Sequence, residues 1–142
     1  MENPALLPVT DDPLVVRTDY ADDAVWATIC DLIRAPVREG HQEFYAYVEF
    51  WESSEIRNLT ETELLARVPD DYPHSFVFVV DKVTTADPAF PILVMDLHYE
   101  RGRTFRALPS TIQGIQNNLS LANMDFFEFA DNADSDGVFR GF

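Results

Sequence analysis

Residues 74–99, HSFVFVVDKVTTADPAFPILVMDLHY, contain the two most apolar runs of the chain. Residues 76–80 and 92–95 are short, rich in β-branched or aromatic side chains, and bounded by turn residues, as is typical of strands buried on both faces. Only 11 residues, two of them proline, separate these runs, and a crossover connection between parallel strands needs about a dozen or more. The two strands are therefore expected to pair antiparallel.

Downstream of this hairpin, the turn at residues 100–103 leads to a third strand at residues 104–108, which completes an antiparallel meander. A capping box, Ser110-x-x-Gln113, then predicts the start of a helix.

The end of that helix has two interpretations. In the first, Asn117 and Asn118 terminate it, residues 119–121 form a short edge strand, and Asp125 caps a last helix over residues 126–133. In the second, a single helix interrupted by Gly114 runs through the segment. The Asn-Asn pair favours the first interpretation.

Upstream of the hairpin, residues 1–12 lack a period and contain two prolines, which predicts an extended arm that packs through its apolar residues Leu6, Leu7 and Val9. Residues 14–18 are predicted to form a strand. An amphipathic helix over residues 23–34 follows, with Asp19 or Asp22 as its N-cap and Cys30 on its apolar face.

Residues 44–51, FYAYVEFW, alternate as a strand does. One face, with Phe44 and Phe50, is expected in the core, and the other is aromatic with polar tips. A turn at residues 38–42 precedes this strand, and a short helix with the capping box Thr60-x-x-Glu63 follows it.

These elements predict a single globular α/β (α+β) domain over residues 1–142. We expect a mixed sheet of about five strands that ends in an antiparallel meander and is covered by three to four helices. The alternating order of strands and helices in the first half favours parallel neighbours there.

Charge is the most unusual global property, with 25 acidic against 10 basic residues and a formal net charge of -15. Such a chain repels nucleic acid and anionic membranes, so neither is an expected partner. The longest apolar runs are far below the roughly 20 residues of a membrane span. One cysteine and no recognisable secretory signal favour the cytoplasm.

Candidate chemical groups are sparse. Asp19, Asp81 and Asp96 each follow a predicted strand, yet the antiparallel hairpin places Asp81 and Asp96 at opposite ends of the sheet, which favours caps and turns over a metal site. Residues 132–137 resemble the first half of an EF-hand loop but lack the second half, so a Gly-terminated turn is the better interpretation. We expect no metal and no cofactor.

The histidines have no spacing typical of a metal site, and His98 is the one we consider as a general base, near Asp96 or Glu100. Cys30 is interpreted as a buried, inert thiol. No P-loop, GxGxxG or GxSxG motif is present.

Four motifs carry a resemblance: LVVRTDY at residues 14–20, VPDDYPHSFVFVVD at 68–81, NNLSLANMDFFEFAD at 117–131 and the final GVFRGF. On these residues the chain resembles a family of small, acidic, uncharacterised actinobacterial proteins classed as a domain of unknown function. The resemblance spans nearly the whole chain and implies a bacterial, cytosolic origin. It implies no activity, cofactor or catalytic residue.

Two functional hypotheses follow, with non-enzymatic function preferred. The first is an interaction protein, such as an immunity or inhibitor protein, that binds a basic protein partner. Its predicted binding residues are Tyr45, Tyr47, Glu49, Trp51, Glu52 and Glu55, together with Phe139, Arg140 and Phe142 in the tail, which either packs on the domain or forms an interaction motif. The alternative is a small hydrolase or transferase with a polar site at Asp19, Asp96 and His98.

Overall fold

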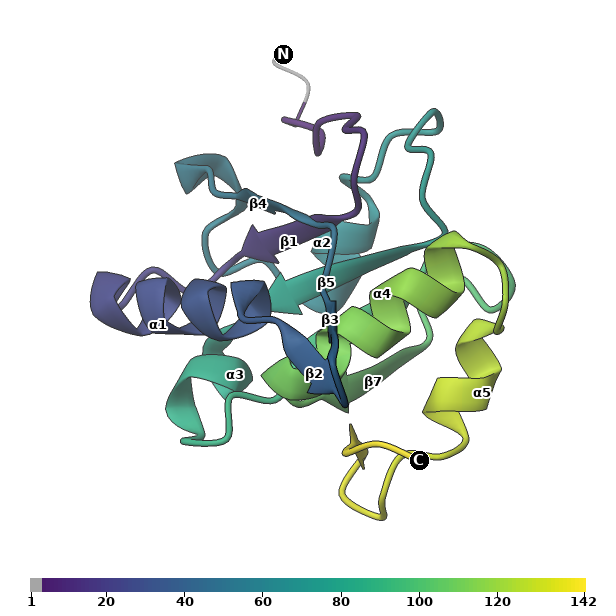
Figure 1. Cartoon of the computed structure of the whole chain (residues 1–142). Coiled ribbons are helices and arrows are strands. Elements are labelled where there is room, and N and C mark those ends of the chain that lie inside the picture. The colour runs from purple at the N-terminus through teal and green to yellow at the C-terminus, as the bar shows by residue number, and fades with distance from the viewer. Residues whose placement is uncertain (1–3) are drawn as a thin grey trace.

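The computed structural model describes residues 4–142 and contains a six-stranded mixed sheet in the order β4-β1-β5-β6-β7-β8 and a separate two-stranded sheet, β2-β3 (Figure 1). The strands are β1 (Leu14–Arg17), β2 (Val37–Glu39), β3 (Gln42–Phe44), β4 (Glu49–Trp51), β5 (Phe76–Val80), β6 (Ile92–Asp96), β7 (Thr104–Ala107) and β8 (Val138–Phe139). The helices are α1 (Asp23–Arg34), α2 (Glu61–Leu65), α3 (Lys82–Ala86), α4 (Ile112–Ser120) and α5 (Phe126–Ala130), with 3-10 turns η1 (Ser54–Ile56) and η2 (Pro109–Thr111).

The predicted central hairpin is confirmed. Strands β5 and β6 pair antiparallel, with Phe76 opposite Asp96, and every residue of both strands is buried. β7 adds antiparallel to β6 and completes the meander. The connection between β5 and β6 contains one short helix, α3, which Asp81 caps by accepting the N–H of Thr84 at 3.0 Å.

The parallel arrangement expected for the first half is also confirmed, because β1 pairs parallel with both β4 and β5. Helix α1 has the predicted bounds, and Asp22 is its N-cap: the Asp22 carboxylate accepts the N–H groups of Ala24 and Val25. The α2 capping box forms as predicted between Thr60 and Glu63.

Each face of the sheet has its own apolar core. The first core packs α1, α4 and α5 against one face, and the second packs η1, α2 and Leu7 of the N-terminal arm against the other. Figure 1 shows α1 and α4 in front of the sheet and α2 behind it. Consecutive crossovers from β1 and β4 therefore leave toward opposite faces.

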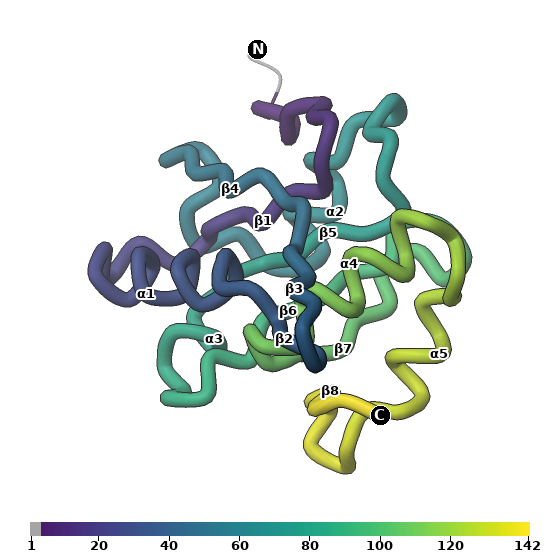
Figure 2. Tube along the Cα trace, in the orientation of Figure 1, coloured from purple at the N-terminus to yellow at the C-terminus, as the bar shows by residue number. Residues whose placement is uncertain are grey.

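The single strand predicted over residues 44–51 is wrong. Residues 42–44 form β3, which turns back on β2 through Gly40 at φ 62°, and residues 49–51 form β4 in the main sheet. Figure 2 shows the intervening segment leading from β3 up to β4. Its backbone bonds to side chains of α4 instead of to a neighbouring strand, which explains the break.

The helix-strand-helix interpretation of residues 110–131 is wrong in its middle. Helix α4 continues through Asn117 and Asn118 to Ser120, since both side chains bond within the helix, from Gln113 to Asn117 and from Asn118 to Gly114 O. The Ser110 capping box is absent too, because η2 occupies that position and α4 has no side-chain cap. The last helix follows Asp125 as predicted, but it ends at Ala130.

The N-terminal arm is extended as predicted, with its first three residues outside the described part. Leu7 is buried, and its N–H donates to Arg67 O at 2.8 Å, whereas Leu6 and Val9 are exposed. The arm is also held by the Arg67 guanidinium, which donates to Ala5 O at 3.1 Å, and by the His74 ring, whose Nε2 lies 2.9 Å from Thr10 O.

Candidate protein-interaction surface

Six of the predicted partner-binding residues lie on β4 and on the segments directly before and after it, and we call Tyr45, Tyr47, Glu49, Trp51, Glu52 and Glu55 the edge surface. Tyr47 is 60% exposed and Tyr45 is 42% exposed, while the three glutamates are also exposed. Trp51 is half-buried and packs against the second core. Ala46, Val48 and Phe50 pack on the first core as the alternation predicted, but Phe44 is not among its residues, and only Glu49 and Trp51 of the edge surface belong to a strand.

Helix α4 holds the tyrosine segment in place. The buried Gln116 side chain accepts the Tyr47 N–H at 2.8 Å, and the Asn117 side-chain amide donates to Tyr45 O at 3.1 Å. Ala46 and Val48 pack inward against the first core. With these inward residues fixed, Tyr45 and Tyr47 point outward from an ordered backbone.

Acidic groups surround the tyrosines. The Tyr45 hydroxyl donates to Glu43 at 2.9 Å, and this hydrogen bond, followed by the nearby Glu43 charge, raises the pKa of Tyr45. A depression of about 460 Å³ beside Tyr47 is also lined by Asp11 and Asp12. The surface therefore combines aromatic contact area with negative charge.

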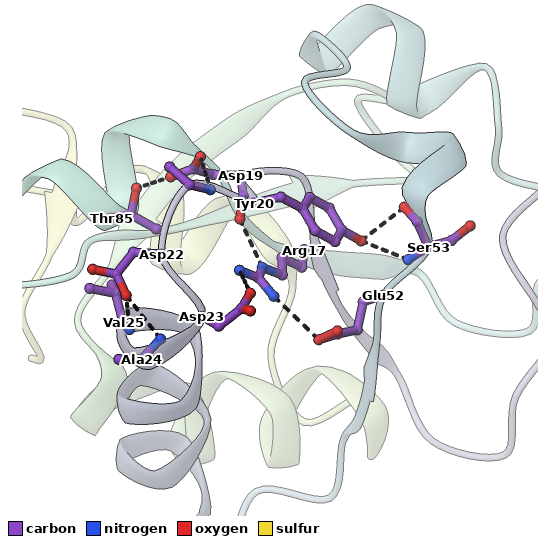
Figure 3. A network of polar contacts seen from close by, with 11 residues as sticks. Arg17, Asp19, Tyr20, Asp22, Asp23, Ala24, Val25, Glu52, Ser53 and Thr85 are labelled. Carbon is purple, nitrogen blue, oxygen red and sulfur yellow. Dashed lines mark hydrogen bonds and ion pairs between the residues drawn. The ribbon is translucent and has the colours of Figure 1, made fainter.

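Beyond the carboxyl ends of β1 and β4, side chains of the protein bond to one another (Figure 3). Ligands commonly gather at such strand ends in open α/β sheets, and a cavity of about 380 Å³ does lie beyond β1 and β5, beside Asp19, Asp81 and Lys82. The buried Arg17 guanidinium donates to Asp19 O at 2.8 Å and to Asp23 at 2.7 Å, and lies 3.5 Å from Glu52. Tyr20 packs over it, with the ring centroid 4.5 Å from the guanidinium carbon. The Tyr20 hydroxyl bonds to the backbone of Ser53.

This network joins the start of α1 to the end of β4. The contact with Arg17 fixes the position of Glu52, the residue that follows β4. Burial, the largest influence, raises the pKa of Tyr20 despite the hydrogen bond to Ser53 O. Its hydroxyl is therefore a neutral hydrogen-bonding group that spans the two strand ends.

The structure does not bring the three residues of the enzymatic alternative together. Asp19 follows β1 beyond the Val80 end of β5, whereas Asp96 stands opposite Phe76 at the other end of that strand. Asp19 accepts hydrogen bonds from Thr85 and from Ala21 N–H.

Asp96 and His98 do lie at the same end of the sheet. Both carboxylate oxygens of the buried Asp96 accept backbone N–H groups, from His98 and Glu100, at 2.9 Å each. The exposed His98 ring packs against Tyr99. Asp96 thus holds a turn by its carboxylate.

Asp81, the third strand-end aspartate, forms a bidentate pair with Arg106 at 2.9 and 2.8 Å. Burial by itself would raise the pKa of Asp81, but the hydrogen bonds from Arg106 and Thr84 outweigh it, and the pKa lies below its usual value. The charged carboxylate therefore fastens β7 to the β5–α3 junction.

The C-terminal tail packs onto the domain. β8 pairs parallel with β7, and Phe139 is only 3% exposed, so it belongs to the first core.

Arg140 forms ion pairs with Asp134 and Asp136. Mainly through its hydrogen bond, Arg140 lowers the pKa of Asp136 to about 2. The half EF-hand sequence thus forms a turn closed by Gly137 at φ 81°. Phe142 is 79% exposed, beside Phe129 and Phe139.

Cys30 is buried on α1 as predicted, and burial raises the pKa of its thiol to about 11. Across residues 4–142, no three His, Cys, Asp or Glu side chains form a group that could hold a metal ion. None of the helices in this part of the chain is long and apolar enough to cross a bilayer.

Comparison with family models matches residues 12–142 to a family described as Domain of unknown function (DUF6924). The chain belongs to the DUF6924 family. This agrees with the resemblance inferred from the motifs at residues 14–20, 68–81 and 117–131. Comparison of this DUF6924 chain with curated proteins and with solved structures gives no match.

Sequence reasoning missed the residues that organise this DUF6924 surface. Asn117 was interpreted as a helix terminator and Gln116 was assigned no role, yet each holds a backbone group roughly 70 positions away in the chain. Arg17 carried a visible signal, since a charge inside the apolar run LVVRT needs a buried partner.

Proposed function

We propose that this DUF6924 chain is a small acidic interaction protein that binds a basic protein partner through the edge surface, in the manner of an immunity or inhibitor protein. The observation that supports the proposal is the exposure of Tyr45 and Tyr47 on the segment that leads into β4, together with the exposure of Glu49, Glu52 and Glu55 on and after that strand. Tyrosine supplies rigid contact area with a polar tip, and it is enriched at protein interfaces.

The distribution of charge supports a basic partner. Six of the ten basic residues are in ion pairs within residues 4–142: Arg17, Arg34, Arg38, Arg103, Arg106 and Arg140. These ion pairs involve nine carboxylates, so most acidic side chains of residues 4–142 lie in no ion pair. A field of this sign accelerates encounter with a basic protein and opposes nucleic acid and anionic membranes.

The proposed setting is the cytoplasm of a bacterial cell. A single cysteine whose thiol is buried and protonated suits a reducing compartment. A gene for a basic toxin next to the gene for this chain would favour the immunity role over other inhibitory roles.

The test is a cross-linked pull-down from the source cells with three forms of the protein. The wild type and Tyr99→Ala, which removes a tyrosine that is 70% exposed outside the edge surface, are expected to recover the same basic protein. The double variant Tyr47→Ala/Glu49→Gln is expected to lose it, by about tenfold or more if Tyr47 lies at the centre of the contact. If the double variant recovers every protein that the wild type recovers, the edge surface is not the binding site.

A further inference from the structure

Strand β4 leaves one side of its backbone open. Within residues 4–142 its one neighbour is β1, with Glu49 and Trp51 opposite Leu14 and Val16. The N–H of Glu49 donates to Pro13 O at 2.9 Å. Because backbone polar groups alternate in direction along a strand, the N–H and C=O of Phe50 point away from β1. Such an edge is a template for another strand.

Carboxylates lie on both sides of this open edge. Glu49 shares a face with Trp51, which packs on the second core, whereas Glu52 reaches Arg17 beside α1 on the opposite face. Glu49 takes part in no ion pair of the described chain, whereas one carboxylate oxygen of Glu52 already lies 3.5 Å from Arg17 and the side chain remains 45% exposed. An incoming strand would therefore meet negative charge above and below its own plane.

We propose that the partner docks by adding an extended, arginine- or lysine-bearing segment as a strand beside β4. This inference rests on the proposed function and specifies the partner segment and its mode of binding. Backbone hydrogen bonds to Phe50 supply affinity, and Glu49 and Glu52 select basic side chains.

The short length of β4 explains why the edge is open without being a general aggregation site. A three-residue strand offers few backbone groups, and charged flanking residues oppose pairing between two copies of the same acidic chain. A basic segment is free of that repulsion. The negative charge that opposes pairing between two copies of the chain therefore attracts the proposed basic segment.

The test uses the full chain, labelled with nitrogen-15, and an acetylated, amidated peptide of alternating arginine and valine as the probe. On peptide addition, hydrogen exchange of the Phe50 amide is expected to slow by about tenfold or more, because exchange then requires the added strand to open. The Tyr47 amide, already bonded to Gln116, is the internal control and should change little. A peptide with every amide N-methylated keeps its charge but cannot pair, and it should bind weakly.

The outcomes separate this inference from the proposed function. Shifts at Tyr45 and Tyr47 without protection of the Phe50 amide would overturn strand addition while leaving a basic partner on the edge surface. A probe that shifts no edge-surface resonance would overturn the docking of basic extended segments, and the pull-down then decides on the proposed function by itself. A glutamate-valine peptide that protects Phe50 equally well would overturn the selection for basic residues.

Discussion

At the scale of single residues, the pair between Asp81 and Arg106 is expected to contribute to stability, because both side chains are mostly buried and the contact is bidentate. Asp81→Asn keeps an acceptor for Thr84 but leaves the Arg106 charge without its partner. We expect a loss of about 2 kcal/mol in the free energy of unfolding, measured by urea denaturation.

Asp131→Asn is the matched control for that variant, since it removes an equally short but exposed pair with Arg103. Its cost should be a small fraction of the cost of Asp81→Asn, because water screens exposed pairs. Equal costs for the two variants would show that burial does not determine the strength of the Asp81 pair.

The same aspartate predicts a pH dependence. Since the pKa of Asp81 is lower in the folded chain than in the unfolded chain, its contribution to stability is complete above the unfolded pKa of about 4 and is lost as pH falls through the folded pKa. The difference in unfolding free energy between the wild type and Asp81→Asn should therefore be constant above about pH 5 and shrink below it. Urea titrations at several pH values measure this, and a difference that stays constant in acid would contradict it.

At the scale of elements, the sequence was informative wherever local signals and tertiary packing agree. The buried runs at residues 76–80 and 92–96, the Asp22 cap and the Thr60 capping box all act within a few positions of the chain, and each was predictable. The break at residues 45–48 was not, because an alternating pattern records which side chains face inward but not which backbone groups are bonded.

In helix α4, a local sequence signal for a helix end was overridden by hydrogen bonds of the folded chain. Asn-Asn is a frequent terminator in isolation, but Asn117 and Asn118 find hydrogen-bond partners inside the helix, and Asn117 also holds Tyr45 O. The edge-surface residues could be named from alternation alone. Their anchoring to α4, and the separation of Asp19 from Asp96, required the three-dimensional pairing of the strands.

Gln116→Ala tests whether α4 fixes the tyrosine segment. Removing the acceptor of the Tyr47 N–H should cost about 1 kcal/mol of stability and accelerate hydrogen exchange of the Tyr47 amide. Gln113→Ala, on the same helix but with its bond directed to Asn117, is the control and should leave that exchange unchanged. If Tyr47 exchange is equally slow in both variants, the Gln116 bond does not fix the segment, and the Asn117 bond to Tyr45 O and the packing of Ala46 and Val48 hold it instead.

At the scale of the whole molecule, the same buried sheet carries two exposed regions that differ in their bonding. One is the carboxyl ends of its parallel strands, and the other is the border of β4. Arg17 and Tyr20 use the strand ends of β1 and β4 for internal bonding, whereas a cavity of about 380 Å³ lies beyond β1 and β5, beside Asp19 and Asp81. The border of β4 is exposed and acidic. Because Asp19 lies at the other end of β5 from Asp96, a binding function along the edge is more consistent with this architecture than a reaction at Asp19, Asp96 and His98.

Net charge gives the last prediction, in which salt acts in opposite directions on folding and on binding. Folding brings the carboxylates of a chain with net charge -15 close together, and added salt shortens the Debye length from about 30 Å at 0.01 M to about 8 Å at 0.15 M. The urea midpoint of unfolding should therefore rise across this range, because screening reduces repulsion more in the compact state than in the extended one.

Association with the arginine-valine peptide, which depends on attraction between opposite charges, should become slower and weaker over the same range. Sodium and potassium chloride should act equally, since screening depends on ionic strength and not on the identity of the cation. A midpoint that falls with salt would mean that the ion pairs of Arg17, Arg106 and Arg140 contribute more to stability than the excess acids remove.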